Sequence, residues 1–322
     1  MNEMYKETDE KHSDLYKMPV YKIQFWKYNL RDVELISQNK RIFRREYMSK
    51  KVIFLDIDGT LAEPGHSEPP ASAIEAVRKA QAAGNLVFLC SGRNYGMLSS
   101  FLEYGFDGVV ASAGGYILCG ENVIYDCPMT DAQRIKTMDT LTESGLCWIA
   151  ECRDEAYASD SFKAFVEKDI DEQVSSEFLR WREFVKKTFS IRSIEEYRNQ
   201  PVYKFVATSP SMKRLDAPRK ALEEEFLFCI QDVSHGVVNL ELINRKFNKG
   251  TAVRKVCEYL QIPVSDSVGF GDSMNDKEML ETAGLSICME NGSEAVKRIA
   301  DEVCPKVTED GIWKAFQKHH LM

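Results

Sequence analysis

The sequence predicts an α/β protein, with a Rossmann-like parallel sheet covered by helices on both faces and a second α+β domain inserted into it. Three observations support this prediction. Short apolar runs alternate with helical patterns near both ends of the chain. A stretch richer in charge and aromatic residues separates these two regions. The chain has 322 residues, which is enough for about two domains.

The alternating patterns define the expected elements in chain order. Apolar runs rich in branched residues predict strands buried on both faces, and apolar residues at helical spacing predict the helices between them. We expect strands at 52–55, 86–90, 109–110, 267–270 and 285–289, a hairpin of 117–118 with 123–124, and helices at 74–81, 94–104, 249–260, 275–282, 294–300 and 311–318.

The spacing of the chemical motifs locates the inserted domain. Only 33 positions separate Asp58 from Ser91, which leaves room for one helix and one strand, whereas 158 positions separate Ser91 from Lys249. We therefore expect a catalytic core formed by 48–127 and 238–322, with the inserted domain at 128–237. Residues 1–47 lack the alternation, and either an upstream translation start or an appended segment explains them.

Composition restricts the class of protein. Hydrophobic residues make up 44% and charged residues 29%, as in folded globular chains, and the net charge of −8 argues against a nucleic-acid partner. No apolar run reaches the roughly 18 residues that span a bilayer, and the N-terminus lacks a signal-peptide core. Nine scattered cysteines without a CxxC pair favour the reducing cytosol, so we expect a cytoplasmic protein without a membrane partner.

Two aspartates follow the first predicted strand, in the run Asp56-Ile57-Asp58-Gly59-Thr60. The carboxyl ends of parallel strands are where open α/β sheets bind ligands. One carboxylate could attack phosphorus while the other handles the proton of the leaving group, and two close negative charges call for Mg²⁺. A plain Asp-Gly turn is the alternative interpretation.

Two weaker motifs could hold phosphate. Ser91-Gly92-Arg93 follows the second strand, where a hydroxyl and backbone N–H groups at a strand-to-helix junction can bind an anion, although a simple loop explains it as well. Lys249 opens a predicted helix and could neutralise both phosphate and a nucleophilic carboxylate, although an isolated lysine is usually a surface charge.

The fourth motif, Gly271-Asp272-Ser273-Met274-Asn275-Asp276, again follows a strand. Asp272 and Asp276 are placed to complete a magnesium site, directly or through water. Capping of the next helix by Asn275 or Asp276 is the alternative. All four motifs lie at carboxyl ends of strands or at helix starts, so they can converge on one edge of the sheet.

In combination, these motifs resemble the haloacid dehalogenase superfamily, and within it the Cof-type subfamily IIB phosphatases with a C2B cap. The resemblance covers about 51–316, and the runs GFGDSMNDKEMLETAG and CMENG are especially similar to the family's pattern. It implies a phosphatase with Mg²⁺ as cofactor. It also implies that a large inserted cap closes over the site and selects a small soluble phosphomonoester.

The resemblance assigns a role to each motif. Asp56 would be the nucleophile that forms an aspartyl-phosphate, Asp58 the general acid and base, and Lys249 the group that holds phosphate and Asp56. Ser91, Gly92, Arg93 and Asn275 would bind the phosphoryl group. Mg²⁺ would be held by the Asp56 side chain, the Asp58 backbone carbonyl, Asp272 and Asp276. The family often has Asn where this chain has Ala113, so no substrate contact is carried over to that position.

The leading hypothesis is a Mg²⁺-dependent phosphatase that hydrolyses a small sugar phosphate or phosphorylated cofactor. A phosphosugar mutase of the same superfamily and a non-catalytic metabolite-binding protein on the same scaffold are the alternatives. Hydrolysis of a generic aryl phosphate would favour the phosphatase, whereas tight ligand binding without turnover would favour the binding protein. The sequence leaves the oligomeric state open.

Overall fold

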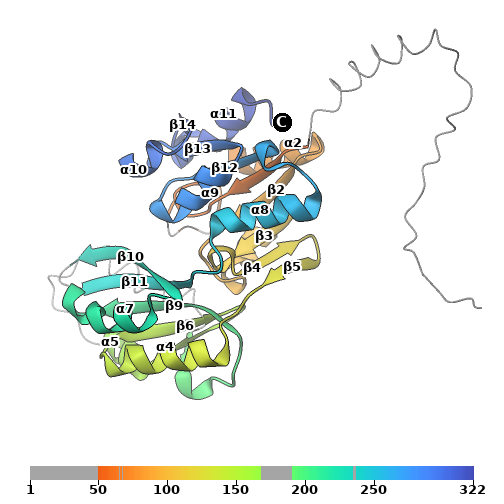
Figure 1. Cartoon of the computed structure of the whole chain (residues 1–322). Coiled ribbons are helices and arrows are strands. Elements are labelled where there is room, and N and C mark those ends of the chain that lie inside the picture. The colour runs from red at the N-terminus through yellow and green to blue at the C-terminus, as the bar shows by residue number, and fades with distance from the viewer. Residues whose placement is uncertain (1–49, 65, 67, 168–190, 235–236) are drawn as a thin grey trace, which may run out of the picture. The chain divides into compact units, whose positions relative to one another are not determined.

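The computed structural model describes residues 50–322 except 65, 67, 168–190 and 235–236 (Figure 1). The predicted extension 1–47 lies outside these residues. Two sheets are present in the part described, one with eight strands and one with six. This confirms the predicted fold class, an α/β core with an inserted domain. Within the described residues, no helix combines the length and the apolar character needed to cross a membrane.

The larger sheet has the strand order β14-β13-β12-β1-β2-β3-β4-β5. The first six of these strands run parallel, and β4 and β5 form the predicted antiparallel hairpin at one edge. The strands are β1 (Val52–Leu55), β2 (Leu86–Cys90), β3 (Gly108–Ala111), β4 (Tyr116–Cys119), β5 (Asn122–Asp126), β12 (Ser267–Gly271), β13 (Leu285–Met289) and β14 (Glu302–Cys304).

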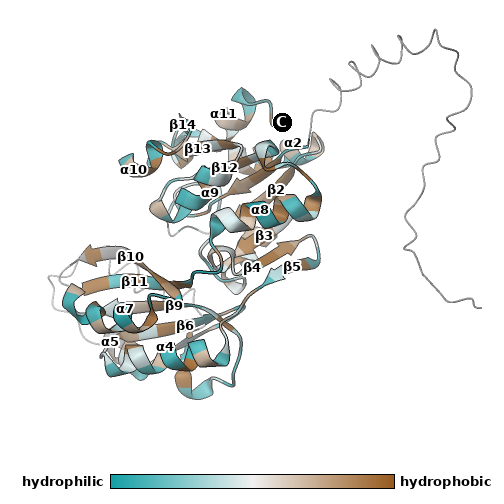
Figure 2. Ribbon diagram, in the orientation of Figure 1, coloured by the Kyte–Doolittle hydropathy of each residue, from teal (hydrophilic) through white to brown (hydrophobic). Residues whose placement is uncertain are grey.

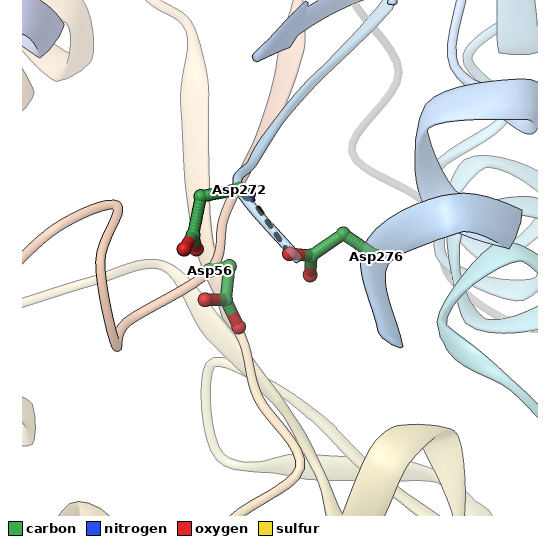
Figure 3. A group of neighbouring side chains, drawn as sticks. All are labelled: Asp56, Asp272 and Asp276. Carbon is green, nitrogen blue, oxygen red and sulfur yellow. Dashed lines mark hydrogen bonds between the residues drawn. The ribbon is translucent and has the colours of Figure 1, made fainter. Parts of the chain in front are cut away.

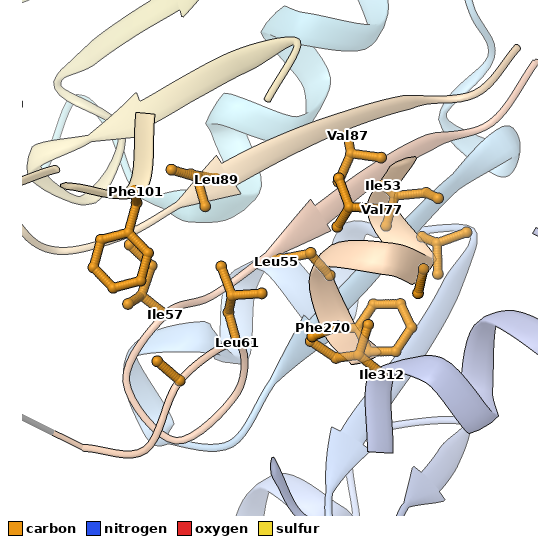
Figure 4. Packing of buried hydrophobic residues seen from close by; sticks show 14 of the residues in the cluster. Ile53, Leu55, Ile57, Leu61, Val77, Val87, Leu89, Phe101, Phe270 and Ile312 are labelled. Carbon is orange, nitrogen blue, oxygen red and sulfur yellow. The ribbon is translucent and has the colours of Figure 1, made fainter. Parts of the chain in front are cut away.

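Helices bury both faces of this sheet because its central strands are apolar throughout. In β1, Ile53 and Leu55 pack in the core on one face, and Val52 and Phe54 pack in the core on the other. The first of these cores includes residues of α2 (Ala71–Ala82) and α11 (Gly311–Lys318), and Figure 4 shows its packing. The second core includes residues of α8 (Lys249–Leu260) and α9 (Lys277–Thr282).

Figure 2 shows the resulting pattern, with brown strands inside and helices that carry both teal and brown. The remaining short helices of the core are α3 (Ser99–Leu102) and α10 (Glu294–Lys297). The predicted helix 94–104 is therefore wrong in length, because a 3₁₀ turn at Gly96–Leu98 and α3 replace it. At Gly96 the backbone approaches the inserted domain so closely that a Cβ atom would lie 2.4 Å from the Asp154 carbonyl oxygen.

The smaller sheet has the strand order β10-β11-β9-β6-β7-β8 and is antiparallel except for the pair β7–β8. Apolar residues on one of its faces form a separate core. Its strands are β6 (Cys147–Cys152), β7 (Ala156–Ala158), β8 (Ile191–Ser193), β9 (Val202–Ser209), β10 (Phe226–Ser234) and β11 (Val237–Asn244). Its helices are α4 (Asp131–Glu143), α5 (Asp160–Glu167) and α7 (Asp216–Leu222).

The pairing of β11 moves one domain boundary. The predicted boundary returns the chain to the core at 238, but β11 pairs with both β10 and β9, so residues up to Asn244 belong to the smaller sheet. We use "inserted domain" for residues 128–244. Two connections join it to the core, one leaving after β5 and one returning from β11 to α8.

Candidate active site

The predicted site residues come together at the carboxyl edge of the larger sheet. Asp56 directly follows β1, Ser91 follows β2 and Asp272 follows β12, while Lys249 is the first residue of α8. Because β2, β1 and β12 are parallel neighbours, their carboxyl ends meet at one edge. Strand pairing thus brings three of the four segments to one place, and the start of α8 adds the fourth.

Asp56 and Lys249 form the centre of this arrangement. Lys249 Nζ lies 2.5 Å from Asp56 Oδ1 and 2.6 Å from Asp276 Oδ1, and 3.2 Å from Asn275 Oδ1. The side chains of Asp56, Lys249 and Asp276 are almost completely buried. The ammonium group is therefore enclosed by oxygen atoms, and the interpretation of Lys249 as an isolated surface charge is excluded.

The start of α8 explains how Lys249 is held. Asn248 is the N-cap of the helix, its side chain accepts the Thr251 N–H at 2.7 Å, and Thr251 Oγ1 accepts the Asn248 N–H at 2.9 Å. This capping box fixes the first turn of the helix. A cation at a helix N-terminus is opposed by the helix dipole. The aspartates around Lys249 offset that repulsion.

Asp272 is positioned by the turn that follows Asp58. Thr60 Oγ1 donates a hydrogen bond to Asp272 Oδ1 at 3.1 Å. Gly59 has φ +86°, and a Cβ atom there would lie 2.3 Å from Asp272 Oδ2. Asn291 Nδ2 donates to the Gly59 carbonyl at 2.8 Å and holds this turn from the other side. Only glycine combines this backbone conformation with so close an approach.

Asp276 uses its carboxylate to organise the loop after β12. Its Oδ2 accepts the N–H groups of Asp272 at 3.0 Å and Ser273 at 3.1 Å, and its Oδ1 accepts from Lys249. Figure 3 shows this backbone contact as a dashed line and shows the Asp272 carboxylate directed toward Asp56. Both oxygens of Asp276 are thus engaged. The carboxylate completes a capping box with Ser273 at the 3₁₀ turn Met274–Asp276, whereas it makes no capping hydrogen bond for α9.

The side chain of Arg93 binds the carboxylate of Asp58. Its Nε donates to Asp58 Oδ2 at 3.0 Å and its Nη2 donates to Oδ1 at 2.6 Å. The Arg93 side chain is mostly buried, whereas that of Asp58 is 42% exposed. Such a two-point contact fixes the plane of the carboxylate. Asp58 is therefore oriented by a residue that follows β2.

Ser91 lies in a buried loop next to β3. Its N–H donates to the Val110 carbonyl at 2.8 Å, and its Oγ accepts the Arg93 N–H at 3.2 Å. Its carbonyl accepts the N–H of Ala113 at 3.0 Å. Ala113, the position at which the family often has Asn, has φ +57° and is buried. Asparagine and glycine tolerate this left-handed conformation better than alanine does.

Electrostatics at the site are set by an excess of negative charge. Burial raises the pKa of Asp56 well above its ordinary range, and the nearby carboxylates of Asp276 and Asp272 add to the shift while Lys249 opposes it. Burial, reinforced by Asp276, raises the pKa of Asp272 to about 6. Burial opposes the charge of Lys249, but Asp276 and Asp56 outweigh this effect and raise the pKa of Lys249 well above its ordinary range.

The donor set fits a hard divalent cation such as Mg²⁺. Asp56, Asp272 and Asp276 each offer a carboxylate oxygen, and the three atoms lie within 4.8 Å of one another. Carboxylate oxygens are the ligands that Mg²⁺ prefers. Burial is the main cause of the raised pKa values of Asp56 and Asp272, and a bound cation would offset the part that the neighbouring carboxylates add.

Two contacting residues were not assigned roles from the sequence. Thr60 binds Asp272, and Asn291 binds the Gly59 carbonyl. Thr60 lies in the same run as Asp56, and Asn291 lies in the CMENG run after β13, so both belong to motifs that resemble the family's pattern. Their partners lie more than 200 positions away, which no local pattern indicates.

Fold and cluster together define a class of protein. It is an α/β enzyme with a group of aspartates and one buried lysine at the carboxyl edge of its sheet, beside an inserted domain. A model of the haloacid dehalogenase-like hydrolase family matches residues 53–316. The chain belongs to this family.

Relatives and solved structures refine the classification. Phosphatase YwpJ of Bacillus subtilis (strain 168) is 29% identical over 290 residues, which is 84% of this chain and 100% of the relative. Pyridoxal phosphate phosphatase YbhA of Escherichia coli (strain K12) is 26% identical, over 84% and 99%. The structure of the subclass IIB sugar phosphatase BT4131 has the same fold, with a TM-score of 0.66 and 24% identity over 85% and 100%.

The family model and the phosphatase relatives agree with the family that the motifs predict, and the solved structure shows the same fold. The chain is a phosphatase of this family, a hydrolase of phosphomonoesters. All nine cysteines lie within the described residues and each is free, so disulfides contribute nothing to this fold.

Proposed function

We propose that this protein is a Mg²⁺-dependent phosphatase that hydrolyses a small sugar phosphate or phosphorylated cofactor through an aspartyl-phosphate on Asp56. The observation that carries the proposal is the buried contact of 2.5 Å between Asp56 and Lys249 inside a cluster of carboxylates. A lysine ammonium there stabilises the ionised nucleophile and can also hold the oxygens of an incoming phosphate.

Asp56 and Asp58 divide the chemistry between them. A carboxylate oxygen of Asp56 attacks phosphorus, the bond from phosphorus to the leaving oxygen breaks, and that oxygen takes a proton from Asp58. Water then attacks the phosphorus of the aspartyl-phosphate and gives its proton back to Asp58, which releases inorganic phosphate and regenerates Asp56. In the structure both oxygens of Asp58 accept hydrogen bonds from Arg93, so Arg93 orients the group that carries this proton.

The transferred phosphoryl group is held by the surrounding polar groups. Ser91 offers its hydroxyl, Gly92 and Arg93 belong to the same loop, and Asn275 contacts the Lys249 ammonium at 3.2 Å. Positioning and charge stabilisation account for most of the catalysis of phosphoryl transfer. Donors that are already fixed by other contacts suit this task because they need little reorganisation.

Mg²⁺ would be held by Asp56 and Asp272 together with the Asp58 backbone carbonyl. Asp276 would act through water, because its oxygens already accept hydrogen bonds from Lys249 and two backbone N–H groups. When bound, the ion supplies positive charge next to the phosphoryl oxygens. Together with Lys249, it explains how a chain of net charge −8 can bind an anionic substrate.

The substrate class rests on the relatives. One is named a pyridoxal phosphate phosphatase and another a sugar phosphatase, which are the two kinds of substrate proposed here. The inserted domain, which touches the core at Gly92 and Gly96, can select among them. A site that is covered by such a domain favours small soluble phosphomonoesters as substrates.

Hydrolysis of p-nitrophenyl phosphate tests the proposal. We expect release of phosphate that requires Mg²⁺, stops with EDTA and is lost in Asp56→Asn, with Asp139→Asn on an exposed helix face as the matched control. Full activity in Asp56→Asn would contradict the nucleophile assignment. Transfer of phosphate between positions of a sugar without release would favour the mutase, and binding without turnover would favour the non-catalytic alternative. A screen of phosphorylated metabolites then identifies the substrate.

A further inference from the structure

The inserted domain carries a buried charged group outside the acidic cluster. Lys204 lies on β9, and its side chain is 3% exposed. Its Nζ lies 2.6 Å from Glu241 Oε1 and 3.3 Å from Glu151 Oε2. Glu151 is opposite Lys204 across the β6–β9 ladder, and Glu241 lies on the neighbouring strand β11. We use "cap triad" for Lys204, Glu151 and Glu241.

The cap triad reaches the core through its lysine. Lys204 Nζ donates a hydrogen bond to the Gly92 carbonyl at 2.9 Å, across 112 positions of sequence. Gly92 stands between Ser91 and Arg93, two residues of the proposed phosphate loop. A second contact lies four residues on, where the Gly96 N–H donates to the Arg153 carbonyl at 2.9 Å. The inserted domain therefore holds the segment 92–96 at both of its ends.

The buried charges of the cap triad suggest that the ammonium group of Lys204 is retained for its hydrogen bond to the Gly92 carbonyl. A buried lysine between two carboxylates costs desolvation energy, and a structural core could be built more simply from apolar residues. Burial lowers the pKa of Lys204, but the carboxylates of Glu151 and Glu241 outweigh this effect and raise it above its ordinary value. The side chain is therefore a charged ammonium group. Burial also raises the pKa of Glu151, and the nearby Lys204 only partly opposes this effect.

The geometry points to Lys204 as a positioning residue that ties the inserted domain to the phosphate loop and thereby orients Ser91 and Arg93. This inference rests on the proposed function, because it assigns these two residues to phosphate and Asp58. The Gly92 carbonyl belongs to the peptide whose N–H, that of Arg93, donates to Ser91 Oγ. Arg93 in turn binds Asp58 at two points. Loss of the Lys204 contact would let the loop move and would disturb the contacts of Arg93 with Ser91 and Asp58.

Four variants test the inference. Lys204→Met removes the ammonium, and Lys204→Arg keeps a charged donor. The triple variant Lys204→Met, Glu151→Gln, Glu241→Gln removes all three charges together, since isolated buried carboxylates could prevent folding of the single variant. Lys213→Met, at an exposed lysine of the same domain, is the matched control. Each protein is assayed with saturating Mg²⁺, and hydrogen exchange is measured over residues 91–96.

We expect kcat of Lys204→Met and of the triple variant to fall about tenfold, the usual effect of losing a hydrogen bond from a charged group, while KM changes less. Exchange over 91–96 becomes faster in both, and Lys204→Arg retains most of the activity. Normal kcat and normal exchange in the triple variant would overturn the inference, even if that variant were less stable. An inactive wild-type protein would contradict the proposed function, and the exchange data would still decide the role of Lys204.

Discussion

Arg93 holds Asp58 by both carboxylate oxygens, at 2.6 Å and 3.0 Å, although the two residues are 35 positions apart in the sequence. The loop after β2 thus orients a side chain of the loop after β1. Both loops follow neighbouring parallel strands, so strand pairing holds the two loops next to each other. The proposed general acid and base is therefore oriented by a residue that lies in the proposed phosphate loop.

Replacement of Arg93 tests this arrangement. Arg93→Met is expected to lower kcat about ten- to a hundredfold, because hydrogen bonds to a charged group contribute about 1.5–3 kcal/mol. Arg93→Lys restores only part of the activity, since an ammonium cannot match the two-point geometry. Arg78→Met on the exposed face of α2 is the control, and steady-state kinetics with p-nitrophenyl phosphate gives the measurement. Equal kcat values for Arg93→Met and Arg78→Met would exclude the orienting role.

Replacement of Gly59 tests whether Mg²⁺ binding depends on the position of Asp272, and Gly84 provides the matched control. Gly59 and Gly84 both have left-handed backbone, with φ +86° and +91°, so alanine costs about 1 kcal/mol of strain at either position. A Cβ atom at Gly59 would lie 2.3 Å from Asp272 Oδ2, whereas nothing lies within 4 Å of one at Gly84. We expect Gly59→Ala to raise the Mg²⁺ concentration needed for half-maximal activity, and Gly84→Ala to leave it unchanged. A similar requirement in both variants would contradict the prediction.

The raised pKa of Asp272 predicts how stability depends on pH in the metal-free protein. Burial raises this pKa from 3.8 to about 6, so between these values the folded chain keeps a proton that the unfolded chain releases. The contribution of Asp272 to stability therefore falls as pH rises through this window, and the full cost of its charge is present above it. Mg²⁺ should offset that cost and raise the melting temperature more at about pH 7.5 than at about pH 5.

Calorimetry with and without Mg²⁺ at the two pH values provides the measurement. Asp272→Asn serves as the control, because a neutral amide removes the titration and weakens ion binding, so both the pH dependence and the Mg²⁺ effect should shrink. An equal Mg²⁺ effect at the two pH values in the wild-type protein would count against the prediction.

Ala113 provides a prediction on stability. It has φ +57°, a conformation that costs alanine roughly 1–2 kcal/mol, whereas glycine adopts it freely. Ala113→Gly should raise the free energy of unfolding by up to about 1 kcal/mol, after the loss from a more flexible unfolded chain. Ala111→Gly, at an extended position with φ −107°, should lower it by about 0.5–1 kcal/mol. Urea denaturation checks both, and a loss of stability in Ala113→Gly would refute the strain argument.

Much of the cluster could be predicted because it depends on local sequence. Asp56 and Asp272 each follow a short apolar run that predicts a buried strand, and parallel pairing of these strands brings the two residues together. Lys249 opens a helix whose apolar residues recur at helical spacing, and the structure starts α8 at this residue. The roles given to these residues remain proposals. Strand order and direction are enough to bring Asp56 and Asp272 together, and the start of α8 adds Lys249.

Contacts between distant segments could not be predicted in the same way. β11 alternates apolar and polar residues as any half-buried strand does, and only its pairing with β10 and β9 assigns it to the inserted domain. Lys204 looks like an ordinary charged residue in a strand until β6 and β11 place carboxylates beside it. The expected helix at 94–104 is shortened because Gly96 packs against the Asp154 backbone, which helical periodicity does not reveal.

The capping box at Asn248 has a consequence for how such proteins can be re-engineered. It lies at the end of the return connection from the inserted domain and fixes the first turn of α8, which begins at Lys249. Asp56, Lys249, Asp272 and Asp276 all lie outside residues 128–247, so the proposed reacting groups and the domain proposed to select the substrate are encoded in separate stretches of chain. A recognition module from a relative could be transplanted between Cys127 and Asn248 without redesign of the reacting groups. The graft would have to re-create the donor that Lys204 offers to Gly92.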